Sequence, residues 1–210
     1  SGHQVTVVTA IPDYPHGRFF KGYSLFRRRA EMINGLSVIR LPIIPRGKGS
    51  TFRIILNYLS FYISVSIFTF FHAFRNKYDR IFVHLTSPFF VGLAAVHLKK
   101  RQKIPLLFWT LDLWPESISS ASSIKSPYII NPINKMVCYV YNNCDKILIG
   151  SKGFASSICA KGNYKDKLVY FPNWSEYNSN ESDNIANIPL IEPFVSKKED
   201  DFIVLFAGNL

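Results

Sequence analysis

The chain has 210 residues, of which 48% are hydrophobic, so it suits one sizeable α/β domain, or one and a fraction, and not a disordered tail. The net charge of +11 comes from short basic clusters, which suit an anionic lipid surface, phosphorylated substrates or no partner at all. Nucleic acid is disfavoured, because the sequence has no zinc-finger, RRM or KH signature. The three cysteines have neither zinc-ligand nor CxxC spacing, which favours a reducing cytosol.

The amino-terminal part predicts two strands separated by a long loop. Residues 5–10 are β-branched and apolar, and the second strand, residues 36–43, is entered through the turn pair Asn34-Gly35. The loop between them, IPDYPHGRFFKGYSLF, is too long for a mere connector. We predict either that it contacts a ligand or that its aromatic residues pack beneath it. Its candidate ligand contacts are Asp13, Tyr14, His16 and Tyr23.

Residues 51–75 predict a long helix. From 54 to 74 the sequence contains no Asp, Glu, Lys or Arg, so a membrane span has to be considered. Leu, Ile and Phe occupy one face, however, and a polar stripe occupies another. This pattern favours a buried helix packed on a sheet over a helix lying partly in a membrane interface, and favours a true span least. The polar stripe consists of Asn57, Ser60, Ser64 and His72, the last expected to be a helix-end residue.

Residues 80–86 predict a strand, and the helix that follows has small residues that allow close packing on a sheet. At the end of the strand, Thr86 and Ser87 can present hydroxyls and helix amino-terminal N–H groups to an anion. A plain serine N-cap followed by proline explains them equally well. His84, within the strand, is expected to be a satisfied core histidine and not a ligand.

The functional prediction depends most on residues 104–116, IPLLFWTLDLWPE. Residues 105–111 are bulky and apolar, as in a strand buried on both faces of a parallel sheet. Asp112 ends this strand, and Glu116 falls in the first turn of a predicted helix. Ligands in open α/β sheets bind outside the carboxyl ends of the strands, so these two acids are the first candidates for chemistry. The alternative is that Asp112 is an N-cap and Glu116 a partner of the helix dipole.

The rest of the first domain continues the alternation of strands and helices. We predict a serine-rich loop at 119–126, helices at 132–143 and 153–161, and strands at 146–151 and 167–171. Ser151 again places a hydroxyl at a strand end. The alternation implies an α/β fold with a doubly wound parallel sheet. The sequence has no Gly-rich phosphate loop, nucleophile elbow or metal-ligand cluster.

The last part of the chain predicts a domain boundary. Residues 175–201 are polar with few aromatics and are expected to be a linker. Residues 202–210, FIVLFAGNL, predict the first strand of a second α/β domain. We therefore expect a first domain at residues 1–174, in a chain that looks like a piece of something longer.

A series of short motifs in a fixed order resembles glycosyltransferase family 4. More narrowly, it resembles bacterial enzymes of the fucosamine-transferase kind that build O-antigen and capsule. The resemblance covers nearly the whole chain. The motifs are GHQVTVVT, INGLSVIRLP, LNYLSF, LTSPFFVGLAA, LDLWPES, CDKILIGSKGF, LVYFPNW and FIVLFAGNL.

This resemblance implies a GT-B architecture, with an acceptor-binding amino-terminal domain, a carboxyl-terminal domain that binds a sugar nucleotide, and retention at the anomeric carbon. It implies that the family's first strand and helix would precede Ser1 and that nearly all of the donor domain would follow Leu210. Residues 1–210 alone would then transfer no sugar. It assigns Asp112 to the cleft-facing end of the central strand, and it assigns to neighbouring strand ends Thr86, Ser87 and Ser151.

The function that the resemblance implies is hexosyl transfer from a sugar nucleotide to a lipid-linked saccharide in O-antigen, capsule or lipopolysaccharide synthesis. N-acetyl-fucosamine is one candidate sugar, and neither a cofactor nor a metal is expected. The expected location is the cytoplasm, peripheral at the inner face of the bacterial plasma membrane, with anionic lipid as a partner. The alternatives are a non-enzymatic nucleotide-sugar or lipid-binding module and a membrane-associated assembly protein.

Overall fold

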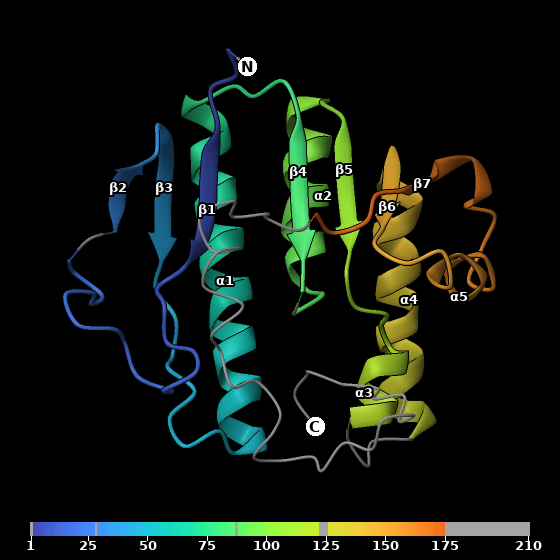
Figure 1. Ribbon diagram of the computed structural model, residues 1–210, viewed down its shortest axis with the longest axis horizontal. Helices are drawn as coiled ribbons and strands as arrows, with labels where there is room; N and C mark the ends of the chain where they lie inside the picture. The colour runs from blue at the N-terminus through green and yellow to red at the C-terminus, as the bar shows by residue number, and fades with distance from the viewer. Residues whose placement is uncertain (1, 28, 87, 122–125, 175–210) are drawn as a thin grey trace, which may run out of the picture. The chain divides into compact units, whose positions relative to one another are not determined.

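The computed structural model describes residues 2–27, 29–86, 88–121 and 126–174 (Figure 1). The chain divides into two units, of which the first is Ser1–Pro172. The fold described below is that of this first unit. The predicted linker at 175–201 and the predicted strand at 202–210 lie outside the described residues.

The strands form two sheets. In the larger one, all neighbours pair in parallel, in the order β4 (Ile81–Leu85), β5 (Leu106–Thr110), β6 (Lys146–Ile149) and β7 (Leu168–Tyr170). In the smaller one, β3 (Leu36–Leu41) lies in the middle, parallel to β1 (Thr6–Ala10) and antiparallel to β2 (Ala30–Ile33). The predicted α/β class with a parallel sheet is confirmed. Among the described residues, no strand pairs with the edge of β1 that is away from β3, or with the edge of β4 that is away from β5.

The sequence analysis missed β2, which forms a hairpin with β3. Asn34 and Gly35 connect the two strands, with φ of +49° and +79°. A two-residue hairpin turn of this hand needs positive φ at both positions, which Asn and Gly tolerate best. The turn pair was recognised as the entry to β3, but the short and largely exposed β2 lacks the apolar alternation that predicts a strand.

Three long helices form one layer behind the strands in Figure 1. They are α1 (Thr51–Arg75), α2 (Val91–Gln102) and α4 (Pro127–Asn143). The prediction for α4 began five residues late, because Pro127 lies in the first turn, where its missing N–H costs no intrahelical bond.

The shorter elements are α3 (Glu116–Ala121), α5 (Phe154–Cys159) and a 3-10 turn at Lys165–Lys167. Because α3 includes Ser119 and Ser120, the prediction that the serine-rich segment is a loop is wrong for these residues.

The main core lies between the larger sheet and the helices α2 and α4. Its fully buried side chains include Phe89, Phe108 and Tyr141, whose rings pack edge to face or tilted at centroid distances of 5.3 to 6.2 Å. The predicted close packing of the small residues of α2 is confirmed at Gly92, where an added Cβ would lie 2.9 Å from a Val140 methyl and 3.0 Å from the Phe108 ring. Position 92 therefore has no room for a side chain.

Helix α1 turns its polar stripe inwards and its apolar face outwards. Asn57 and Thr69 are buried. Ser60 Oγ accepts a hydrogen bond of 2.8 Å from the Ile44 N–H, and Ser64 Oγ donates one of 2.6 Å to the Pro42 carbonyl. Of the most apolar part of the helix, only 11% of the residues are buried. The helix does pack on the sheet, but the prediction that it is buried is wrong.

The neighbouring loop explains this orientation. Residues 42–50 run from the end of β3 to the start of α1, and their backbone groups need hydrogen-bond partners. Side chains of the polar stripe supply those partners, and an apolar face would leave them unpaired. A small apolar cluster of Leu41, Val65 and Ala94, with Phe61 and Phe68 packed against it, contributes to the contact of α1 with β3 and α2.

One face of β4 is exposed. Phe82 is 53% exposed, and His84 is exposed, with its ring centroid 4.9 Å from that of Trp109 in an edge-to-face arrangement. The prediction that His84 is a core histidine is therefore wrong. Alternation along the strand buries Val83 and Leu85 against the helices and turns its neighbours the other way.

Candidate functional site

The carboxyl ends of the parallel strands bring the predicted polar residues to one edge of the sheet. The arrowheads of β1, β3, β4 and β5 point the same way in Figure 1. Leu85 pairs with Thr110 and Thr110 with Ile149, so Thr86, Asp112 and Ser151 all lie one or two residues past the paired ends. Ser87 lies outside the described residues.

Asp112 is held by a tryptophan that belongs to the main core. Its Oδ2 accepts a 3.1 Å hydrogen bond from the indole N–H of Trp114, which is only 6% exposed. The ring of Trp114 packs against Phe89 and Phe90, with centroids 6.2 and 5.6 Å away. The second oxygen, Oδ1, has no hydrogen-bond partner among the described residues. A fixed, half-buried carboxylate with one oxygen unused can accept a hydrogen bond from a ligand hydroxyl.

Thr86 and Ser151 lie on either side of this carboxylate. Thr86 and Ser151 are both exposed, so their hydroxyls can reach a ligand at the edge. Ser151 Oγ also accepts a bond of 3.3 Å from the Gly153 N–H, which fixes the turn after β6. The edge thus carries one carboxylate between two hydroxyls, a set that suits a polyhydroxylated ligand such as a sugar.

Glu116 has a different environment from Asp112. It is the first residue of α3, as predicted, and its Oε1 forms an ion pair with Lys161, whose side chain is only 9% exposed. Its Oε2 is buried and has no partner among the described residues. Lys161 follows α5, so the pair ties α3 to that part of the fold. Glu116 therefore has a structural partner, and the geometry favours Asp112 over Glu116 as the group that meets a ligand.

The long loop after β1 is pinned by Asp13. This carboxylate is 6% exposed, and its Oδ2 accepts hydrogen bonds from the Arg46 N–H at 2.9 Å and from the Asn57 side-chain amide at 3.2 Å. Arg46 in turn lies over the Tyr14 ring, 5.4 Å from its centroid. Asp13 thus holds the loop against α1 and against the loop after β3.

The other predicted loop residues divide into exposed and engaged side chains. Tyr14 is 58% exposed, and His16 is exposed with its ring 5.7 Å from that of Phe20. Tyr23 is half-buried, and its hydroxyl donates a 3.2 Å hydrogen bond to Glu31. Tyr14 and His16 are therefore the loop residues whose side chains are open to a ligand, while Asp13 and Tyr23 hold the loop in place.

Sequence reasoning missed three residues that shape this region. Trp114 orients Asp112, Lys161 pairs with Glu116, and Arg46 joins the two loops. Arg46 was visible only as part of a basic cluster, and a contact across 33 positions has no local signal. The described residues contain no group of three or more His, Cys, Asp and Glu side chains that could hold a metal ion.

Comparison with known proteins gives two similarities. Residues 1–174 match the family described as "Glycosyl transferase 4-like domain". The chain is also 24% identical over 212 residues to WcaI of Escherichia coli (strain K12), which is named as a colanic acid biosynthesis glycosyl transferase. This second similarity covers 100% of this chain and 51% of WcaI, so the chain spans about half the length of that curated relative.

Proposed function

Because the chain belongs to the glycosyl transferase 4-like family, we propose that it is the acceptor-binding part of a retaining glycosyltransferase of bacterial surface polysaccharide synthesis. The donor is a sugar nucleotide, bound by a second domain of which residues 202–210 would form the first strand. The acceptor is a lipid-linked saccharide at the inner face of the plasma membrane. The similarity to WcaI over about half of its length supports this division. The transferred sugar is a hexose, with N-acetyl-fucosamine as one candidate.

The geometry of Asp112 is the main observation that supports this proposal. Its Oδ2 is fixed by Trp114, and its Oδ1 is unused at the carboxyl edge of the sheet, beside the hydroxyls of Thr86 and Ser151. In this position the carboxylate either orients an acceptor hydroxyl for attack or stabilises the oxocarbenium-like charge that develops at the anomeric carbon. Tyr14 and His16, open at the same edge through the loop after β1, are proposed to contact the acceptor.

Transfer needs groups from both domains, one holding the acceptor and the other the donor, on the two sides of a shared cleft. Positioning of two reactants can supply on the order of 7 kcal/mol or more of the barrier, so one wall alone is not expected to catalyse. We therefore propose that residues 1–210 bind the acceptor without transferring sugar. As the resemblance implies, we propose that transfer uses neither a cofactor nor a metal ion.

Substitution of Asp112 tests the proposal in the whole encoded protein. Asp112→Asn keeps the size of the side chain and an oxygen that can accept from Trp114, but removes the charge. Loss of one electrostatic contact to the transition state predicts a fall in turnover on the order of 100- to 1,000-fold with an unchanged melting temperature. Turnover is measured with radiolabelled sugar nucleotides and lipid-linked acceptors in isolated membranes.

The control is Glu116→Gln, which disturbs the ion pair with Lys161 and not the strand-end edge. We expect it to lower the melting temperature and to leave turnover within a few fold. Normal turnover of Asp112→Asn together with a lowered melting temperature would reject the catalytic assignment. Binding of the lipid-linked saccharide without any transfer would favour the alternative of a non-enzymatic binding module.

A further inference from the structure

A continuous apolar ridge runs along the outer face of α1. Its residues recur every three or four positions, which places them on one side of the helix. From the first to the last the ridge is about 33 Å long, at 1.5 Å per residue. Every member is at least 40% exposed, and five are more than half exposed. The ridge consists of Phe52, Ile55, Leu59, Ile63, Ile67, Phe70, Phe71 and Phe74.

The inner face of the same helix holds it to the protein. Asn57 bonds to the Asp13 carboxylate and to the Ile44 carbonyl, at 3.2 and 2.8 Å. Ser60 and Ser64 bond to the loop backbone as described above. Withdrawal of the helix into a bilayer would break these bonds and remove one of the two hydrogen-bond donors to the buried Asp13 carboxylate. By length and composition α1 could cross a membrane. Its hydrogen bonds, however, hold its inner face along the surface of the protein.

Three arginines border the ridge, and we call them the arginine rim. Arg75 ends α1, Arg29 precedes β2, and Arg101 lies on α2. The Arg101 guanidinium is 3.5 Å from the centroid of the Phe74 ring, so this charge lies directly at the edge of the ridge. None of the three arginines forms an ion pair with a described residue. Their charges are therefore available to an external anion.

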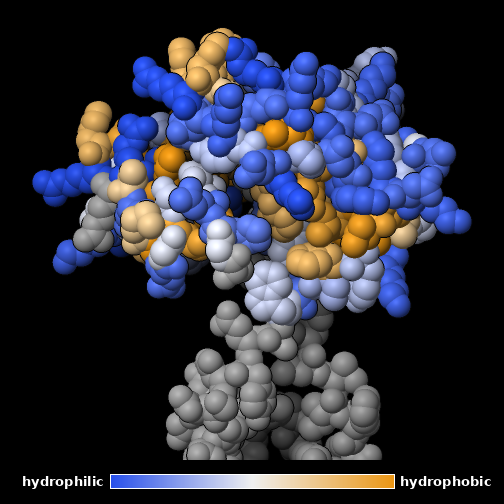
Figure 2. Space-filling view, turned by 90° about the horizontal axis from the view of Figure 1, so that it is seen from above, coloured by the Kyte–Doolittle hydropathy of each residue, from blue (hydrophilic) through white to orange (hydrophobic). Residues whose placement is uncertain are grey.

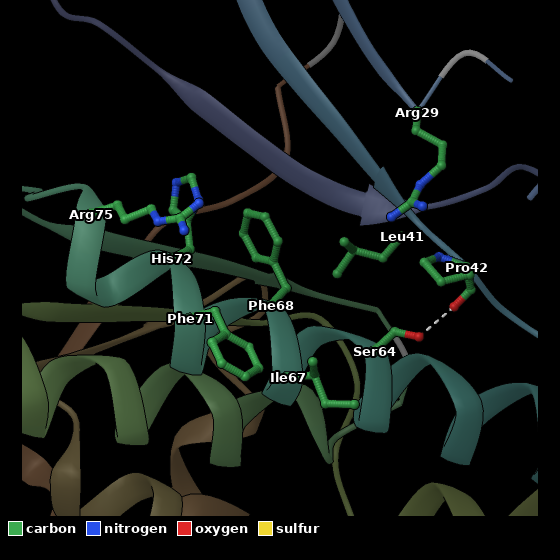
Figure 3. Close-up of a pocket in the computed structure, with 9 residues that line it drawn as sticks. All are labelled: Arg29, Leu41, Pro42, Ser64, Ile67, Phe68, Phe71, His72 and Arg75. Atoms are coloured by element: carbon green, nitrogen blue, oxygen red, sulfur yellow. Dashed lines mark hydrogen bonds between the residues drawn. The ribbon is translucent and has the colours of Figure 1, made fainter. Parts of the chain in front are cut away.

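A groove of about 340 Å³ connects the ridge to two of these arginines. In Figure 3, Phe68 points from α1 toward Leu41 on β3, and Ile67 and Phe71 lie beside it along the helix. Arg75 and His72 lie at one end of this apolar floor, and Arg29 lies across it. An apolar floor between guanidinium groups suits a molecule with an acyl chain and an anionic headgroup.

The charge of the domain is complementary to an anionic surface. Residues 1–174 contain 23 Lys and Arg side chains against 7 Asp and Glu, a net charge of +16, while α1 contains no acid. Figure 2, seen from the amino-terminal edge of β4 and β5, shows apolar patches at the surface among hydrophilic side chains. A contiguous apolar surface with a basic border marks a membrane interaction site.

We propose that the ridge of α1 lies in the interface of an anionic phospholipid leaflet, with the arginine rim on the lipid phosphates. The helix axis would run along the membrane plane, the ridge would enter the acyl boundary, and the groove would admit one lipid chain. This inference deepens the proposed function, since it names the surface by which the domain meets a lipid-linked acceptor. Vesicle binding requires no turnover, so its failure would leave the transferase proposal standing.

Co-sedimentation with vesicles tests the inference on the 210-residue chain. We expect binding to phosphatidylcholine vesicles that contain phosphatidylglycerol, little binding to phosphatidylcholine alone, and release by high salt. The double variant Ile63→Ser and Phe71→Ser removes apolar area from the ridge and should weaken binding at least tenfold. Arg29→Gln and Arg75→Gln should each weaken it about fivefold, as expected for one basic residue near an anionic surface.

The matched control is Phe26→Ser, at a residue that is 92% exposed and not part of the ridge. It should bind vesicles like the unmodified chain, and circular dichroism should show that all variants are folded. The inference is overturned if the control loses as much binding as the ridge variant, or if the ridge variant binds normally. Failure of the unmodified chain to bind anionic vesicles overturns it as well.

A depth measurement separates an interfacial helix from a spanning one. Tryptophan introduced as Phe71→Trp should be quenched by lipids brominated near the headgroup end of the acyl chain, whereas Phe26→Trp should not. Equal quenching at both positions would overturn the inference. Retention of the chain in the membrane pellet after alkaline carbonate would also overturn it, in favour of a true span.

Discussion

Helices α1 and α4 belong to the same layer but turn opposite faces to the protein. The buried residues of α4 are Val137, Val140 and Tyr141, all part of the main core. Two of the three buried residues of α1, Asn57 and Thr69, are polar. Both helices are amphipathic, so periodicity alone describes them equally well. The difference teaches that the neighbouring segment, and not the helix, decides which face is turned inwards.

The segments on which α4 and α1 pack differ in whether their backbone groups already have hydrogen-bond partners. Helix α4 packs on α2 and, through Tyr141, on Phe108 of β5, and the backbone groups of both neighbours are already paired within the helix and the sheet. Helix α1 packs on a loop as well as on β3, and loop backbone groups need polar partners. The free energy gained by satisfying them is on the order of 1 kcal/mol for each bond, and leaving them buried and unpaired costs more.

The largest expected difference compares two phenylalanines. Phe89 is fully buried in the core beside α4, and Phe71 is 65% exposed on the ridge of α1. Phe89→Ala should lower the free energy of unfolding by about 3 to 5 kcal/mol, because it leaves a cavity. Phe71→Ala should change it by less than about 0.5 kcal/mol. Urea unfolding measures both, and a loss above about 2 kcal/mol at Phe71 would show that the ridge is covered in the native protein.

A smaller effect is expected from exchanging residue types across α1. Asn57→Ile places a more apolar side chain on the inner face but removes one of the two donors to the Asp13 carboxylate and the side-chain donor to the Ile44 carbonyl. We expect it to cost about 1 to 3 kcal/mol in the free energy of unfolding. The matched exchange, Ile63→Asn on the outer face, should cost about 0.5 kcal/mol. Stabilisation by Asn57→Ile would mean that α1 is an ordinary amphipathic helix.

The smallest effect concerns the pH dependence of the end of α1. Burial lowers the pKa of His72, whose Nε2 lies 2.6 Å from the Tyr78 hydroxyl. The unfolded chain then binds a proton more tightly than the folded one, so stability should rise with pH between the lowered pKa and about 6.5. Below the lowered pKa the full penalty remains. Thermal melting from pH 5 to 7.5 should show a shallower slope in His72→Gln, and an equal slope would assign the dependence to other groups.

Most of the fold was predictable because it follows from local pattern. The parallel strands are short apolar runs, and the long helices have clear periodicity, so their positions agree with the sequence analysis within a few residues. The failures have tertiary causes. The orientation of α1 depends on the loop at 42–50, and the exposure of His84 depends on what covers the second face of the sheet, neither of which has a local signal.

The candidate site was predictable at the level of strand ends only. Parallel topology is sufficient to bring Thr86, Asp112 and Ser151 to one edge, since it fixes where the carboxyl ends lie. The distinction between Asp112 and Glu116 required the partners Trp114 and Lys161. Both acids look alike in the sequence, and only the contacts show that one has a structural ion pair.

The contact between Gly17 and Gly47 sets a limit on how the loop after β1 can be redesigned. The Gly47 N–H donates a 2.8 Å hydrogen bond to the Gly17 carbonyl, and a Cβ added at Gly17 would lie only 1.7 Å from the Gly47 oxygen. Both residues also have positive φ, of +66° and +61°, which favours glycine. Any redesign of this loop should therefore keep both glycines, so that a changed loop is anchored at the same place on the scaffold.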